Sequence, residues 1–103
     1  TKAIAYIDEN YMKQPGLESI SKAAGVSSQH LCRLFRQTLN CRPMEYITKR
    51  KIQAAKMLLA ETRKTVEQIA EETGFCDSSY FCKIFKRLES ITPSQFRNAE
   101  QVL

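Results

Sequence analysis

Two short stretches of the sequence gather side chains that are positively charged or that donate hydrogen bonds. Residues 28–39 and 78–88 contain no acidic residue, and their charges are +2 and +3. Arg and Lys bind the O6 and N7 atoms of guanine, Gln binds adenine, and hydroxyl groups reach phosphates. The chemistry available to these stretches is therefore recognition of a nucleic acid, provided that each is a helix with these side chains on its outer face.

Apolar residues at helical spacing predict which positions face outward. The inward stripes are expected to be Leu31, Leu34 and Phe35 in the first stretch and Phe81, Ile84 and Phe85 in the second. The outward positions that remain are Ser28, Gln29, Cys32, Arg33 and Arg36, and then Ser78, Ser79, Cys82, Lys83, Lys86 and Arg87. We interpret Cys32 and Cys82 as small residues that allow a partner to approach closely, rather than as redox sensors.

The residue types give little support to catalysis or to metal binding. The four cysteines contain no CxxC pair, and His30 is the only histidine. These spacings do not match a zinc module, so we expect reduced thiols, no metal and no cofactor. His30 precedes the apolar Leu31 and is expected to have a packing or capping role. No phosphate loop or HExxH motif occurs, and the chain is not expected to be an enzyme.

The elements that would position these side chains are predicted to be helices throughout. No segment alternates polar and apolar residues in the manner of a strand, whereas helical spacing recurs along the whole chain. Pro43 begins a long helix, and Thr65, Asp77 and Thr92 stand where N-caps of three further helices are expected. Gly25 is expected to close the helix before the first basic stretch. In total, seven helices are predicted.

The same pattern occurs twice. Ile20, Gly25 and Val26 lie 49 residues before Ile69, Gly74 and Phe75. After one inserted residue the offset becomes 50, which pairs Leu31, Cys32, Phe35, Arg36, Pro43 and Tyr46 with Phe81, Cys82, Phe85, Lys86, Pro93 and Phe96. Each copy comprises a short helix, a turn containing Gly and a longer helix, which is the helix-turn-helix pattern. We therefore predict two such units joined by a long helix, with Tyr46 and Phe96 in the core.

Length and composition limit the chain to one domain or two small ones. It has 103 residues, of which 43% are hydrophobic and 26% are charged, as is usual for globular proteins. The net charge of +5 permits an anionic partner but does not require one. No apolar run approaches the ~18 residues of a membrane span, and no signal peptide begins the sequence. We expect a cytoplasmic piece of a longer protein, without a membrane partner.

The second copy resembles the signature of the AraC/XylS family of transcriptional regulators. Gly74–Arg87 reads GFCDSSYFCKIFKR, and Ile91–Arg97 reads ITPSQFR. The resemblance covers about residues 2–98. The sequence departs from the family pattern at Asn40 and Ser90, where the family has glycine. Because Ser adopts a left-handed C-cap less readily than Asn, Ser90 is expected to cost some stability.

A third departure lies before the long helix, where Arg42 replaces the usual small hydroxyl residue and should weaken the cap at Pro43. None of the three departures falls on an outward position of the basic stretches. The resemblance implies an all-α DNA-binding domain over residues 1–103, with seven helices in two tandem helix-turn-helix subdomains. The expected ranges are about 17–42 for the first unit, about 43–61 for the linker helix and about 65–98 for the second unit.

The activity that the resemblance implies is sequence-specific binding of double-stranded DNA by a bacterial transcriptional regulator. Two recognition helices would enter successive major-groove segments about 34 Å apart. The isolated domain is expected to be monomeric. The complete regulator is expected to contact RNA polymerase and to contain a further effector-binding or dimerisation domain.

Carried over by position, the resemblance implies roles for individual residues. The base-reading candidates are Gln29, Cys32 and Arg33 in the first unit and Ser79, Cys82 and Lys83 in the second, with Ser78 and Tyr80 as further candidates. Arg36 and Lys86 lie one turn further along their helices and suit phosphate. Because only the first unit has both Arg and Gln on its reading face, it is expected to supply more of the base specificity.

Two other functions remain as alternatives. The exposed faces of a helical interaction module would bind an acidic partner protein instead, and salt dependence with competition by unrelated duplex would distinguish the two. An RNA-binding helical domain is disfavoured because no aromatic stacking platform is expected on the surface. The sequence leaves two interpretations of the basic run Lys49–Arg50–Lys51 open: it either contacts phosphates or only flanks the linker helix.

Overall fold

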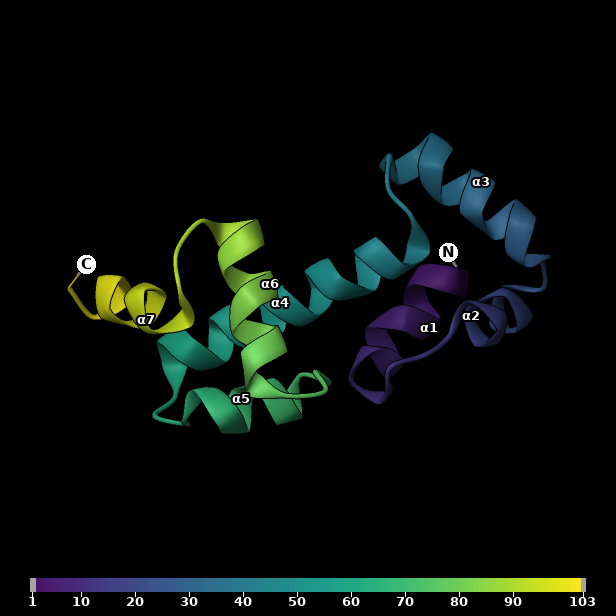
Figure 1. Cartoon of the computed structure of the whole chain (residues 1–103). Helices are drawn as coiled ribbons and strands as arrows, with labels where there is room; N and C mark the ends of the chain where they lie inside the picture. The colour runs from purple at the N-terminus through teal and green to yellow at the C-terminus, as the bar shows by residue number, and fades with distance from the viewer. Residues whose placement is uncertain (1, 103) are drawn as a thin grey trace. The chain divides into compact units, whose positions relative to one another are not determined.

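The computed structural model describes residues 2–102, so that Thr1 and Leu103, the two ends of the expected domain, lie outside the described residues. The described chain forms seven α-helices and one 3₁₀ helix and has no strand (Figure 1). The helices are α1 (Lys2–Asn10), η1 (Tyr11–Lys13), α2 (Leu17–Ala24), α3 (Ser28–Leu39), α4 (Pro43–Glu61), α5 (Val66–Glu72), α6 (Ser78–Glu89) and α7 (Pro93–Val102). The predicted all-α fold is confirmed. No described helix has the length and apolarity needed to cross a bilayer.

Side chains at the predicted helix starts bind the first free backbone amides. Thr65 Oγ1 accepts from the amide of Gln68 at 3.1 Å, and Gln68 Oε1 accepts from the amide of Thr65 at 2.9 Å. The same reciprocal pair joins Thr92 and Gln95, at 3.1 and 2.9 Å. These two capping boxes fix where α5 and α7 begin, because amides that lack a partner within the helix are bonded by the caps. Both N-cap predictions are confirmed.

The ends of α3 and α6 use the left-handed backbone conformation. Asn40 has a φ of 54° and Ser90 a φ of 71°, so both departures from glycine keep the C-cap geometry. Their amides donate to the carbonyls of Arg36 and Lys86, respectively. At the start of α4, the amide of Arg42 donates to Glu45 Oε1 at 3.1 Å. Half of a capping box therefore remains where the hydroxyl residue is missing.

The chain divides into two compact units, with the boundary inside α4 between Arg50 and Lys51. The predicted linker helix, α4, is therefore part of both units. Ile47 packs into the core of the first unit, and Ile52 packs into the core of the second. Helix α1 also belongs to the first core, where Ile7 is fully buried. Each unit thus has a helix ahead of its helix-turn-helix pair.

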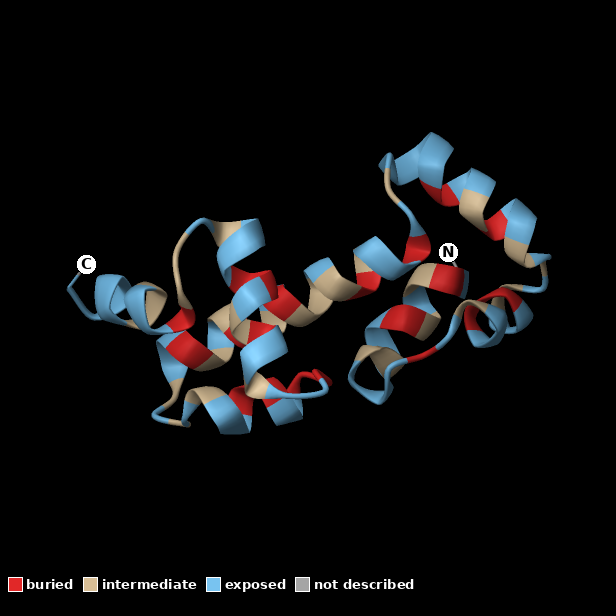
Figure 2. Cartoon of the chain, in the orientation of Figure 1, coloured by how far each residue is buried: buried red, intermediate tan, exposed pale blue. Residues whose placement is uncertain are grey.

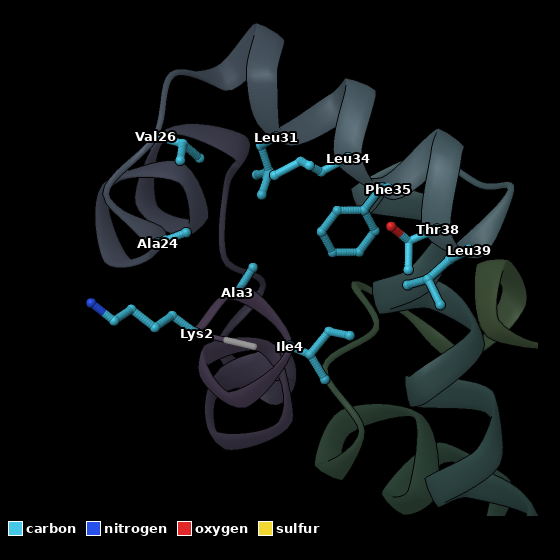
Figure 3. A pocket seen from close by; sticks show the side chains of 10 residues that line it. All are labelled: Lys2, Ala3, Ile4, Ala24, Val26, Leu31, Leu34, Phe35, Thr38 and Leu39. Carbon is cyan, nitrogen blue, oxygen red and sulfur yellow. The ribbon is translucent and has the colours of Figure 1, made fainter.

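The core of the first unit is small and leaves a groove open beside α3. Its buried residues are Ala3, Ile7, Ile20, Leu31, Phe35 and Ile47 (Figure 2). Leu34 is 39% exposed, so its prediction as an inward residue was wrong. It lines a groove of about 260 Å³ with Ile4, Leu31 and Leu39 (Figure 3). Leu34 therefore faces this groove rather than the packed core of the first unit.

The core of the second unit is fuller and is built around aromatic rings. Its buried residues are Ile52, Ala55, Leu59, Ile69, Ala70, Phe75, Phe81, Ile84 and Phe85. Ile84, the repeat counterpart of Leu34, is only 5% exposed. Arg97 of α7 donates to the carbonyls of Leu59 and Thr62 at 3.1 and 3.3 Å, where the C-terminal end of α4 has carbonyls without helical partners. α7 is therefore fastened to the end of α4.

The two units repeat one aromatic contact at equivalent positions. The rings of Phe35 and Tyr46 meet edge to face, with centroids 5.8 Å apart and planes at 71°. The rings of Phe85 and Phe96 have the same 5.8 Å separation and an angle of 72°. Tyr46 and Phe96 are half-buried and pack against the cores rather than lying fully inside them. The internal repeat of the sequence thus corresponds to a repeat in packing.

Candidate nucleic-acid interface

The turn that precedes α3 orients this helix. Gly25 ends α2 with a φ of 73°, a left-handed conformation in which a side chain would be strained. Ser27 then caps α3, because its Oγ accepts from the amide of His30 at 3.1 Å. Leu31 and Phe35, at 1% and 4% exposure, turn the inner face of α3 toward the core of the first unit. The outer face is consequently left for solvent or a partner.

Helix α6 is positioned in an equivalent way. Gly74 has a φ of 87° in the turn after α5. Asp77 Oδ1 accepts from the amide of Tyr80 at 2.7 Å, which confirms the predicted N-cap. Phe81 and Phe85 have no exposed surface and anchor the inner face. Both α3 and α6 are 12 residues long and capped at both ends, and each packs on the core of its unit through one apolar face.

Most of the predicted site residues lie on the exposed faces of these two helices. On α3, Gln29, Arg33 and Arg36 are exposed, whereas Ser28 and Cys32 are half-buried. On α6, the exposed candidates are Ser79, Tyr80, Lys83 and Lys86, and the half-buried ones are Ser78 and Cys82. Each helix therefore presents a polar, basic strip of exposed residues, bordered by small side chains.

Two of the half-buried candidates have contacts within their own unit. Cys82 packs against the core of the second unit and is less outward than predicted. Burial, followed by the nearby carboxylate of Glu67, raises the pKa of the Cys82 thiol. Ser28 Oγ lies 3.3 Å from Oγ of Ser21, which is buried on α2. Ser28 and Cys82 thus contribute to packing and offer little free surface to a partner.

His30 takes part in the N-cap of α3 through its backbone amide, which donates to Ser27 Oγ, and the residue is exposed on the first turn of the helix. The predicted capping role is therefore met by the main chain, whereas a packing role does not fit an exposed residue. The repeat offset of 50 pairs His30 with Tyr80, which is 49% exposed and had been put forward as a candidate. The repeat itself was the signal that would have placed His30 beside the candidates of α3.

The basic residues of the two strips are free of internal ion pairs. The ion pairs among residues 2–102 join Arg50 to Asp8, Lys56 to Glu89 and Lys64 to Glu72. None of them uses Arg33, Arg36, Lys83 or Lys86. Charges without an internal partner remain available to neutralise phosphates.

The basic run in α4 has a different role from the strips. Arg50 Nε donates to Asp8 Oδ1 at 3.3 Å, and its guanidinium lies 4.6 Å from the centroid of the Tyr11 ring. Lys51 donates to the carbonyl of Gly74. Only Lys49 is exposed. Arg50 and Lys51 therefore have internal contacts, which neither of the two interpretations left open by the sequence had included.

The thiols are expected to be dispensable for folding. None of the four cysteines forms a disulfide in the structure, and the described residues contain no group of three or more side chains that could hold a metal ion. Removing reductant, or adding a zinc chelator, should therefore leave the thermal midpoint unchanged, because we expect neither a disulfide nor a metal ion to constrain the fold. Thermal unfolding followed by circular dichroism checks this. One equivalent of bound zinc together with unfolding on chelation would contradict it.

Comparison with known proteins places this geometry in a family. The model of the helix-turn-helix domain family matches residues 20–99, which begin within α2 and include both α3 and α6. The lactose operon transcription activator of Staphylococcus xylosus is 31% identical over 96 residues, which cover 93% of this chain and 34% of that protein. The chain thus spans about a third of the length of such curated relatives.

Two solved structures have the same fold. A transcriptional regulator with an AraC-type DNA-binding domain from Chromobacterium violaceum is 28% identical, with a TM-score of 0.92 over 96% of this chain and 88% of that one. The DNA-binding domain of AdpA, solved with a target DNA, has a TM-score of 0.90 over 97% of this chain and 90% of that one, and at 22% identity its likeness concerns the fold alone. The repeated helix-turn-helix units, the family match and these neighbours together show that the chain belongs to the AraC-type helix-turn-helix family of DNA-binding transcriptional regulators.

Proposed function

We propose that this chain binds double-stranded DNA with α3 and α6 in successive segments of the major groove. The observation that supports this is the pair of exposed basic strips at repeat-equivalent positions on two helices of equal length. An α-helix fits the major groove of B-DNA, where the edges of the bases can be distinguished. Because both helices belong to one chain, no two-fold axis is required.

Individual side chains have separate roles in this proposal. Base edges are contacted by Gln29 and Arg33 from α3, and by Ser79 and Lys83 from α6. Arg36 and Lys86, one turn further on, contact phosphates, as do the free amides at the starts of both helices. Cys32, Cys82, Ser28 and Ser78 border the strips, where small side chains let the duplex come close. Tyr80 lies at the N-terminal end of α6 and is a further contact.

The first unit is proposed to supply more of the base specificity. Only α3 combines an exposed Arg with an exposed Gln, and these two side chains form bidentate bonds to guanine and adenine, respectively. The strip of α6 contains Lys83 and hydroxyl groups, which are less selective. The second unit would then contribute charge and read the shape of the DNA.

The complete protein is proposed to be a bacterial transcriptional regulator that works in the cytoplasm, where its DNA lies, and that contacts RNA polymerase. The names of the relatives support the part of this proposal that concerns transcriptional regulation, and the chain itself corresponds to about a third of their length.

The isolated chain is expected to bind as a monomer to an asymmetric site of roughly 17–20 base pairs, since two reading helices lie in tandem in one chain. Selection from a random duplex pool at about 150 mM salt, followed by footprinting, measures both features. A palindromic site, or protection of only ~8 base pairs, would mean that one unit does not engage DNA. A single compact footprint without symmetry is the expected result.

A further inference from the structure

Lys51 of α4 holds the turn that leads into the second recognition helix. Its ammonium donates a hydrogen bond to the carbonyl of Gly74 at 2.9 Å and lies 5.3 Å from the centroid of the Phe75 ring. One side chain therefore binds two consecutive residues of the α5–α6 turn. A carbonyl oxygen and the face of an aromatic ring are both favourable partners for a cation.

Phe75 connects the turn to α6 through contacts between aromatic rings. The ring of Phe75 is 7% exposed and lies 5.0 Å from the ring of Phe81 and 6.3 Å from that of Tyr80, centroid to centroid. Tyr80 and Phe81 belong to the first turn of α6, next to the strip formed by Ser79 and Lys83. A displacement of Phe75 would therefore displace the end of α6 that is proposed to enter the groove.

The described residues of the first unit show no equivalent clamp. The repeat offset of 49 pairs Phe75 with Val26, which has no ring for a cation to approach. A hydroxyl contact at 3.3 Å between Ser21 and Ser28 links α2 to α3 instead. Among residues 2–102, the cationic clamp is thus a feature of the second unit.

The ammonium group of Lys51 loses part of its contact with water. Its side chain is half-buried, and this burial lowers the pKa of the ammonium, whereas the nearby Cys76 raises it. A charge that loses water needs other partners, and here they are the Gly74 carbonyl and the Phe75 ring. An apolar side chain at this position would fill space but could not bind the carbonyl.

We propose that Lys51 is a positioning residue, which sets the angle at which α6 presents its strip to the bases by fixing Gly74 and Phe75. This inference rests on the proposed function, in which α6 enters the major groove. Hydrogen bonds to base edges require placement to within about 0.5 Å, so a loosened turn would weaken base discrimination by α6. Discrimination by α3 would not change.

The experiment uses the whole chain and three duplexes. One duplex carries the selected site, and each of the other two has one of the two half-sites scrambled. The half-site contacted by α6 is identified as the one at which Lys83→Ala relaxes the base preference. Fluorescence anisotropy gives the ratio of affinities between the intact and the scrambled duplexes. In Lys51→Met this ratio is expected to fall about tenfold for the α6 half and to stay unchanged for the α3 half. Lys51→Arg, which keeps the cation and its donors, is expected to retain the ratio within about twofold.

Lys49→Met is the matched control, because Lys49 is exposed on the same helix and the substitution removes the same charge. It is expected to leave both ratios unchanged, even where it weakens all duplexes equally. If Lys51→Met does not unfold cooperatively, Lys51→Gln takes its place, with an expected fall of at least about threefold. Unchanged ratios in the folded Lys51 variant would overturn the proposal for Lys51 alone. A wild-type chain that binds intact and scrambled duplexes equally would instead overturn the proposed function.

Discussion

Ile84→Ala is expected to lower the free energy of unfolding by about 3 kcal/mol, whereas Leu34→Ala is expected to lower it by less than about 1 kcal/mol. The two positions are equivalent in the repeat, so the substitutions test the same place in the two units. Ile84 is 5% exposed among the aromatic rings of the second core, and its truncation leaves a cavity. Leu34 is 39% exposed beside a groove that is already open, so its truncation creates no new cavity.

Urea denaturation followed by far-ultraviolet circular dichroism measures this difference. A shift of the urea midpoint reports a change in stability when the dependence of the free energy of unfolding on urea concentration stays the same. Leu88→Ala is the matched control for α6, because Leu88 is 38% exposed on the same helix as Ile84. Its expected loss resembles that of Leu34→Ala. Equal losses at Ile84 and Leu34 would contradict the difference in packing between the two units.

The helices and their ends could be predicted because their signals are local. Thr65, Asp77 and Thr92 each bind an amide three residues later, and such contacts depend only on spacing along the chain. The left-handed residues Asn40 and Ser90 were likewise predictable, since the family pattern has glycine there. The repeat extended this local information by showing that the two units share one design.

The orientation of single side chains could be predicted less well, because it depends on what each unit places opposite a helix. Leu34 and Ile84 have the same helical spacing, yet only the second unit covers its residue. Cys82 was predicted to face outward but packs against the core. The contacts of Lys51 join α4 to a turn 23 residues away, and no local pattern predicts them. Tertiary packing determined each of these positions.

Alanine substitutions at Arg33 and Lys86 are expected to have different effects on DNA binding, because Arg33 is proposed to contact bases and Lys86 to contact a phosphate. Both are exposed and neither takes part in an ion pair among the described residues, so alanine at either position should change the free energy of unfolding by less than ~0.5 kcal/mol. Arg33→Ala should weaken binding to the selected site by ~1–3 kcal/mol and relax the preference at one or two base pairs, because its fork binds a guanine edge.

Lys86→Ala should weaken binding to the specific and the scrambled duplexes alike. It should also reduce the slope of the logarithm of the affinity against the logarithm of the salt concentration by about one, because the ammonium neutralises one phosphate. Lys86 follows the buried Phe85 by one position, on the part of α6 that leaves the groove in the proposed arrangement. Fluorescence anisotropy on matched and scrambled duplexes at several salt concentrations measures both effects. If Arg33→Ala weakens both duplexes equally, Arg33 contacts phosphate and the reading face of α3 lies elsewhere on the helix. If Lys86→Ala changes preference rather than slope, the base contacts of α6 extend a full turn further along the helix than proposed.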